Sequence, residues 1–208
     1  MIKTAEAKFV TSAPTIRQAP PASMSEVAFV GRSNVGKSSL LNALADRKGL
    51  AKSSATPGKT KLINFFDVTY KAGEDLRLPM RFVDLPGYGY AKTSKSLKNE
   101  WQKSLAEFLQ KRDSIRVFVL LRDARHPDLE IDEQTKAWLE SLKKGDQVIL
   151  EVFTKADKLK QKDLAALKKR HPDALLVSTL KKRGIDELKK RIVEHLFGPD
   201  TLRQAHAQ

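Results

Sequence analysis

Residues 26–46 join a short apolar run, a glycine-bounded loop and a helical pattern, and this order constrains the fold more than any other stretch. EVAFV is typical of a buried strand, and KSSLLNALAD, from Lys37 to about Asp46, predicts a helix. Between them, GRSNVGKS fits the pattern G-x-x-x-x-G-K-[ST]. Backbone N–H groups of such a loop surround a phosphate, and the helix N-terminus adds positive charge. The stretch therefore predicts a nucleoside-triphosphate site in a parallel α/β sheet.

The residue types in this loop suggest separate roles. Gly31 and Gly36 let the backbone wrap a phosphate closely. Lys37 would bridge the β- and γ-phosphates, and the Ser38 hydroxyl would ligate Mg²⁺. The predicted contacts of the loop with the nucleotide are Gly31, Arg32, Ser33, Asn34, Val35, Gly36, Lys37, Ser38 and Ser39.

The remaining chain alternates predicted strands and helices. KLINFFDVTY, MRFVDL, IRVFVLL, QVILEVF and ALLVS are strand-like, and helical spacing covers 97–109, 131–144, 162–170 and 185–197. This order predicts one doubly wound α/β domain of three layers, with a mostly parallel, six-stranded sheet. We assign the domain to 25–198, after a flexible arm at 1–24 in which AKFV could form one edge strand, and before a frayed tail at 199–208. Ligands of such folds bind at the carboxyl ends of the strands.

The motif DLPG ends the third predicted strand of the domain, roughly 50 residues after the loop. Asp84 would hold Mg²⁺ through water, and Gly87 can offer its N–H to a γ-phosphate and relax when that phosphate leaves. Leu85 and Pro86 stand between them as further nucleotide contacts. Taken alone, DxxG also fits an ordinary turn. Its position after the phosphate loop and at the end of a strand is what indicates a nucleotide contact.

The motif TKAD ends the fifth predicted strand and indicates which base is bound. The Asp157 carboxylate can accept hydrogen bonds from the N1–H and the 2-amino group of guanine, a pair of donors that adenine lacks. An ordinary helix N-cap at Asp157 is the alternative. Lys155 would stack its aliphatic stem on the base, and backbone N–H groups in VST could meet the guanine O6. The predicted base contacts are Thr154, Lys155, Ala156, Asp157, Val177, Ser178 and Thr179.

The loop RKGLAKSSATPGKT, at 47–60, has no apolar period. A GTPase needs a threonine here that reaches Mg²⁺ only when the γ-phosphate is present. We prefer Thr60 to Thr56 because it abuts the second strand, with Gly58 and Lys59 as neighbouring contacts; a plain solvent loop is the alternative. The predicted catalytic residues are Lys37, Thr60 and Gly87, and the predicted metal ligands are Ser38, Thr60 and Asp84.

These motifs, in this order, resemble the small GTPase fold. GRSNVGKSSLLNAL, TPGKT followed by INFF, VDLPGYGYA, RH after VFVLL, and TKADKL are similar to the EngB family (also called YihA or YsxC) of bacterial ribosome-assembly GTPases, over about residues 25–197. The resemblance implies one Ras-like domain, GTP and GDP as ligands, Mg²⁺ dependence and a role in maturing the large ribosomal subunit. It also implies an association with normal cell division and septation.

Hydrolysis is expected to be slow. Ras-like enzymes carry a water-orienting glutamine after the DxxG glycine, where this chain has Tyr88, and neither Tyr90 nor Lys92 is an obvious replacement. A partner or an ion would then accelerate turnover. Asn34 is a candidate for binding K⁺ near the leaving group; if it only caps the loop backbone, exchanging K⁺ for Na⁺ leaves the rate unchanged.

The net charge of +14, from 39 basic and 25 acidic residues, suits a polyanionic partner. The runs KKR at 168–170 and 181–183 are either a solvated face or an rRNA contact, and the resemblance favours rRNA of the large subunit or its precursor. The chain has no cysteine, no secretory signal and no run near the roughly 20 apolar residues of a membrane span. We expect a cytoplasmic monomer.

Two other classes of function compete with a GTPase. A nucleotide kinase would carry an arginine-rich lid and no TKAD. A basic RNA-binding protein with a vestigial nucleotide site is disfavoured by the complete set of motif residues, and measurable turnover would exclude it.

Overall fold

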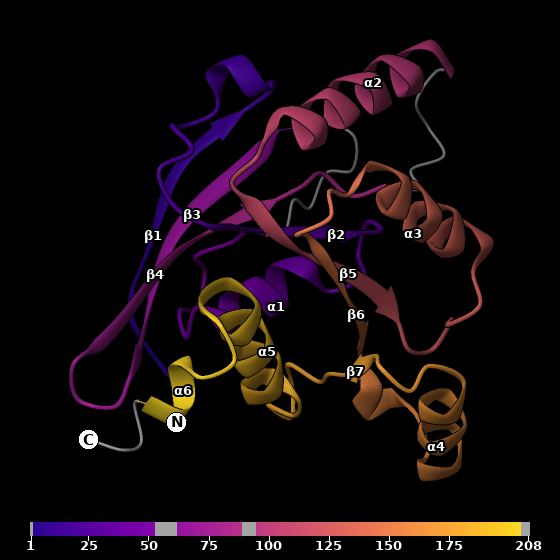
Figure 1. Cartoon of the computed structure of the whole chain (residues 1–208). Helices are drawn as coiled ribbons and strands as arrows, with labels where there is room; N and C mark the ends of the chain where they lie inside the picture. Colours follow the sequence, from indigo (N-terminus) through magenta and orange to yellow (C-terminus); the bar gives the residue numbers. More distant parts are fainter. Residues whose placement is uncertain (1, 53–61, 89–94, 205–208) are drawn as a thin grey trace.

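A single seven-stranded sheet runs through the computed structural model, which describes residues 2–52, 62–88 and 95–204 (Figure 1). The strand order is β1-β3-β4-β2-β5-β6-β7. The strands are β1 (Lys3–Ala13), β2 (Glu26–Gly31), β3 (Ile63–Ala72), β4 (Leu76–Asp84), β5 (Ile115–Asp123), β6 (Val148–Thr154) and β7 (Leu175–Leu176). The helices are α1 (Lys37–Leu44), α2 (Lys95–Lys111), α3 (Glu130–Leu142), α4 (Gln161–Arg170), α5 (Ile185–Phe197) and α6 (Thr201–Gln204), with 3₁₀ turns at Ile16–Gln18 and Ala156–Lys158.

Parallel pairing joins β4, β2, β5, β6 and β7, whereas β1, β3 and β4 pair antiparallel. Every residue of β2 is buried, as expected for a central strand covered on both faces. The parallel pairing brings the carboxyl ends of β2, β4, β5 and β6 to one edge of the sheet. The sequence motifs that end these strands therefore meet there.

Helices cover both faces of the sheet and complete the predicted three layers. α1 and α5 pack on one face through apolar side chains that include Leu41, Leu44 and Ile192. α2 and α3 pack on the other, with Phe108 and Leu139 buried (Figure 1). The predicted doubly wound α/β class is confirmed. None of the helices described here is long and apolar enough to cross a membrane.

The sheet has seven strands, so the prediction of six is wrong, and so is that of a flexible arm over residues 3–13. β1 runs beside β3 from the pair Lys3 and Lys71 to the pair Ala13 and Ile63, far beyond AKFV. At the other terminus, 201–204 form a helical turn whose Leu202 packs against the core, where we expected fraying. Neither segment shows a strong apolar period in its sequence, so neither was predicted. Contacts with neighbouring elements hold both segments in place.

Candidate nucleotide-binding site

The loop between β2 and α1 has a backbone that demands its two glycines. A Cβ on Gly31 would lie 2.8 Å from Cγ1 of Val35, which is closer than packed carbon atoms come. Gly36 has a φ of 102°, in the left-handed region that favours glycine, and directly precedes α1. Asn34 also has a positive φ, 62°. The loop therefore folds back on itself in front of a helix N-terminus, as a phosphate-binding loop does.

Lys37 and Asp84 come together although 46 residues separate them in sequence (residues 38–83). The Lys37 ammonium forms an ion pair with the Asp84 carboxylate, which is buried at the end of β4. Asn64 on β3 donates a hydrogen bond to the second carboxylate oxygen at 3.3 Å, a contact that sequence reasoning missed. Ser38 follows in the first turn of α1, and Ser39 is exposed there. A hydroxyl and a carboxylate are hard oxygen ligands of the kind that Mg²⁺ prefers, so Ser38 and Asp84 fit that ion.

The DLPG segment lies directly on the phosphate loop. Leu85 is buried, Pro86 is half-buried, and a Cβ on Gly87 would lie 2.9 Å from the backbone nitrogen of Ser33. The Ser33 N–H donates to the Tyr88 carbonyl at 3.1 Å. Gly87 is therefore placed at the loop, and only a residue without a side chain fits this approach.

The TKAD segment also contacts the phosphate loop. The Thr154 hydroxyl donates to the carbonyl of Val35 at 2.6 Å. Lys155, at a φ of 58°, donates through Nζ to the carbonyl of Asn34 at 2.8 Å and to Asp123 at 2.9 Å. The TKAD motif therefore lies against the phosphate loop. Stacking of the Lys155 stem on a base stays a prediction.

Asp157 and the VST segment meet at the far side of this site. The Ser178 hydroxyl donates to Oδ1 of Asp157 at 2.5 Å, and this bond holds the pKa of the carboxyl below its ordinary value. The Ala156 N–H donates to the carbonyl of Val177 at 3.1 Å, and Thr179 follows, half-buried. Asp157 is therefore kept charged and can accept hydrogen bonds from two N–H groups.

Asp123 belongs to the site and was not among the predicted residues. It is buried at the end of β5 and accepts hydrogen bonds from Lys155 and, at 2.7 and 3.0 Å, from the guanidinium of Arg125. Burial opposes its charge, but the bonds from Arg125 and Lys155 outweigh burial and lower its pKa. An aspartate ending a buried strand of a parallel sheet was the available signal.

The variant Asp123→Asn is expected to weaken GDP binding about fivefold, since a neutral acceptor holds the Lys155 ammonium less firmly. Equilibrium binding of a fluorescent GDP measures this effect. Asp173→Asn, an exposed aspartate after α4, is the matched control. Equal affinities of the two variants would show that Asp123 does not position Lys155 for binding.

The predicted switch threonine, Thr60, lies outside the described residues, together with Thr56, Gly58, Lys59, Tyr90 and Lys92. Their roles remain predictions. Of the helix predicted over 97–109, the side chains of Leu97 and Trp101 are not among those described, whereas Leu105, Phe108 and Leu109 are buried in the core.

Comparison with known proteins places this geometry among GTPases. Residues 26–155 match the model of a family described as 50S ribosome-binding GTPase. The chain is 53% identical to the probable GTP-binding protein EngB of Aliarcobacter butzleri over 93% of this chain and 98% of that protein. It is 50% identical to that of Wolinella succinogenes, over 96% and 100%.

Solved structures show the same fold. A crystal structure of a probable GTP-binding protein EngB has a TM-score of 0.62 at 24% identity, over 83% of this chain and 98% of that one. Era, solved with MgGDPNP and nucleotides 1506–1542 of 16S ribosomal RNA, has a TM-score of 0.59 at 28% identity, over 83% of this chain and 57% of that one.

Proposed function

The chain belongs to the EngB family of GTP-binding proteins, and on this basis we propose that it is a GTP-operated conformational switch in assembly of the large ribosomal subunit. The proposal includes a need for the protein in normal cell division and septation, and a cytoplasmic, monomeric state. One observation carries the nucleotide assignment: the Ser178 hydroxyl keeps Asp157 charged, and Lys155 of the same TKAD motif donates to the phosphate loop. The family description as 50S ribosome-binding supports the partner.

In a P-loop GTPase of this geometry, Lys37 exchanges its partner during the cycle. Its ammonium pairs with the Asp84 carboxylate here, and it would turn to the β- and γ-phosphates of bound GTP. Ser38, Thr60 and Asp84 would hold Mg²⁺, which neutralises phosphate charge when bound. Era was solved with the magnesium complex of a GTP analogue, which supports this part of the proposal.

Slow hydrolysis is the expected chemistry of the site. The hydroxyl of Tyr88, which occupies the place of a water-orienting glutamine, donates to Asp132 on α3 at 2.8 Å. A tyrosine cannot orient an attacking water in the way that a glutamine does, so slow turnover is expected. Turnover is raised either by a partner or by K⁺ bound near Asn34. Asn34 is exposed in the phosphate loop and is therefore accessible to an ion.

The two basic runs differ in what their side chains contact. Lys168 donates to two backbone carbonyls after α4, at 2.6 and 2.8 Å, and Arg170 pairs with Asp128 at 2.7 Å. Lys181, Lys182 and Arg183 are exposed, and none of them forms an ion pair with another residue in the described part of the chain. The second run is therefore the better candidate for an rRNA contact.

The turn that presents this run is well defined. Ser178 and Arg183 exchange backbone hydrogen bonds at 2.9 and 3.0 Å. A Cβ on Gly184 would lie 2.4 Å from the carbonyl oxygen of Leu176, so only glycine fits there. The 181–183 turn is thus a well-defined, basic and exposed segment next to the predicted base contacts.

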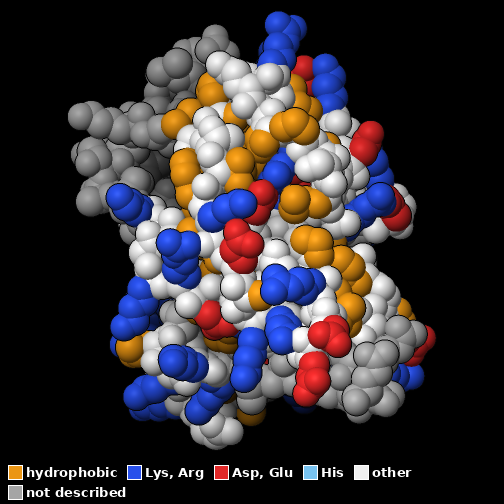
Figure 2. Space-filling view, turned by 90° about the vertical axis from the view of Figure 1, so that its left-hand side faces the viewer, with side chains coloured by type: hydrophobic (Ala, Val, Ile, Leu, Met, Phe, Trp, Pro, Cys, Tyr) orange, Lys and Arg blue, Asp and Glu red, His pale blue; other side chains and the backbone are white. Residues whose placement is uncertain are grey.

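On the β1 side of the molecule, Lys and Arg side chains are scattered over the surface with fewer acidic ones between them (Figure 2).

Co-sedimentation with large ribosomal subunits tests the proposed function. The wild type is expected to bind subunits with different affinity in GTP-analogue and GDP states. The double variant Lys181→Glu/Lys182→Glu is expected to bind at least about tenfold more weakly, because two phosphate contacts and their released counterions are lost.

The matched control is Lys48→Glu/Lys71→Glu, which changes the charge equally at two exposed lysines elsewhere. Equal losses in both double variants would mean that net charge, and not the 181–183 turn, governs binding. Absence of subunit binding by the wild type in both nucleotide states would contradict the ribosomal role.

A further inference from the structure

Asp132, in the first turn of α3, is a fully buried carboxylate that the nucleotide site does not use directly. The Tyr88 hydroxyl donates to its Oδ1 at 2.8 Å, and Nε of Arg32 lies 3.7 Å from the same oxygen. Its other oxygen, Oδ2, has no hydrogen-bond partner among the described residues. Burial raises the pKa of Asp132. A buried carboxylate with incomplete hydrogen bonding destabilises a fold, so this one requires an explanation beyond packing.

Within the described residues, the two side chains that contact the Asp132 carboxylate both belong to the nucleotide site. Arg32 is part of the phosphate loop, and Tyr88 directly follows the DLPG glycine. The backbone of Tyr88 is paired with the loop on both sides, since its N–H donates to the Gly31 carbonyl at 3.3 Å and its carbonyl accepts from Ser33 at 3.1 Å. Asp132 therefore holds the side chain of Tyr88, whose backbone is already paired with the phosphate loop.

The DLPG segment lies so close to the phosphate loop in this arrangement that little space remains between them. Gly87 approaches Ser33 so closely that an added Cβ would lie 2.9 Å from both its backbone nitrogen and its hydroxyl. A γ-phosphate that accepts from the Gly87 N–H needs room at that place. We therefore expect the segment from Asp84 to Tyr88 to shift when GTP binds, which would strain or break the contact between Tyr88 and Asp132.

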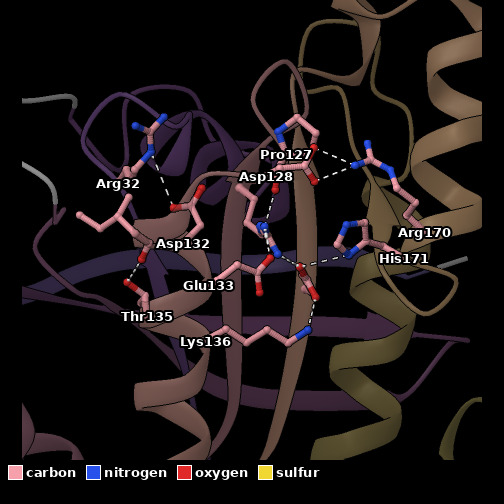
Figure 3. Close-up of polar contacts among 12 residues, drawn as sticks. Arg32, Pro127, Asp128, Asp132, Glu133, Thr135, Lys136, Arg170 and His171 are labelled. Carbon is pink, nitrogen blue, oxygen red and sulfur yellow. Dashed lines mark hydrogen bonds and ion pairs between the residues drawn. The ribbon is translucent and has the colours of Figure 1, made fainter.

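Ion pairs anchor α3 to the sheet, so we expect Tyr88 and not α3 to move. Arg122, fully buried at the end of β5, pairs with Glu133 of α3 at 2.5 Å and with Glu151 of β6. Lys136, one turn further along α3, pairs with Glu151 at 2.7 Å. Figure 3 shows Arg32 and Asp132 facing each other on one side of α3, with Glu133 and Lys136 pointing the other way. The helix is thus tied to β5 and β6 while it holds Tyr88.

We propose that Asp132 is a positioning residue that holds Tyr88, keeps the DLPG segment on the phosphate loop and so favours GDP over GTP. The inference rests on the proposed guanine-nucleotide function and adds a residue to it. Tyr88 stands where a Ras-like enzyme has its glutamine. Its hydrogen bond to Asp132 stabilises the resting state, in which the DLPG segment lies on the phosphate loop. GDP leaves the contact intact, and GTP binding has to release it.

The test is the ratio of two dissociation constants, for a non-hydrolysable GTP analogue and for GDP, both with Mg²⁺. In Tyr88→Phe the ratio is expected to fall about tenfold, because the lost hydrogen bond to a charged group stabilises only the resting state. Asp132→Asn keeps an acceptor for the hydroxyl and removes the charge, so a smaller fall is expected. Tyr70→Phe is the matched control: it removes a buried hydroxyl that donates to the Leu44 carbonyl at 3.0 Å, and should leave the ratio unchanged.

The double variant Tyr88→Phe/Asp132→Asn is expected to show no larger fall than Tyr88→Phe alone, since both changes remove one interaction. An unchanged ratio in Tyr88→Phe, or an equal weakening of both ligands, would overturn the inference and leave a purely structural role. Absence of guanine-nucleotide binding by the wild type would overturn the proposed function as well, so the two failures are distinguishable.

Discussion

Replacing Asp157 by alanine is expected to weaken GDP binding about a thousandfold and to remove the preference for guanine over adenine. The carboxylate is charged, is oriented by the Ser178 hydroxyl and offers acceptors for two N–H donors of guanine. Two hydrogen bonds to a charged group are together worth about 4 kcal/mol, which corresponds to about a thousandfold in affinity. Equilibrium binding of fluorescent GDP, with GDP and ATP as competitors, measures both effects.

Asp163→Ala is the matched control for this change. Asp163 is an exposed aspartate in the first turn of α4, so its loss removes the same charge without touching the site. Its GDP affinity should stay within about twofold of the wild type. If Asp157→Ala retains tight and guanine-selective binding, Asp157 serves only as a cap of the following turn, and the base is recognised elsewhere.

Replacing Arg122 by leucine is expected to destabilise the fold by about 3–5 kcal/mol, since the change leaves carboxylates that were paired with a buried charge. Glu151 is the more affected partner because its side chain is only 11% exposed, whereas that of Glu133 is 53% exposed. Burial raises the pKa of Glu151, but bonds from Lys136 and Arg122 outweigh burial and lower it. Urea unfolding should show the loss as a lower midpoint at unchanged slope, and thermal unfolding as a decrease of about 10 °C.

Arg116→Leu provides the comparison on the same strand. Arg116 pairs with Asp146 at the surface, where both side chains are about half exposed. Exposed pairs contribute less than about 1 kcal/mol, so this variant should unfold close to the wild type. Equal destabilisation of the two variants would mean that the Arg122 pairs do not anchor α3, and the fixed position of Asp132 would then need another cause.

The phosphate loop and the last helix could be predicted because local sequence determines both. Gly31 and Gly36 are needed by the loop's own backbone, and the context of strand and helix lies within about 20 residues. The helix predicted at 185–197 forms over Ile185–Phe197, where apolar residues recur at helical spacing and Gly184 precedes the first turn. Such features need little information from distant parts of the chain.

The edge strand β1 could not be predicted in full, because pairing with β3 and not its own side chains makes it a strand. Its sequence KTAEAKFVTSA buries only Ala7 and Ala13, and its partners lie some 50 to 70 residues away. Asp123 and Asp132 were missed for a related reason. Each is an ordinary acidic residue in sequence, and its role follows from contacts with Lys155 or Tyr88 that only the folded chain creates.

Competition for bound fluorescent GDP by GDP, GTP and ATP, with the wild-type protein and Mg²⁺, shows whether this site selects guanine. Both guanine nucleotides should displace the fluorescent ligand in the same concentration range, within about the tenfold set by the Tyr88 contact. ATP should displace it at least about a hundredfold less effectively, because adenine cannot donate to Asp157. Displacement by ATP as efficient as that by GDP would rule out guanine recognition by Asp157, and the function would have to be sought among ATP-using phosphotransferases or assembly factors.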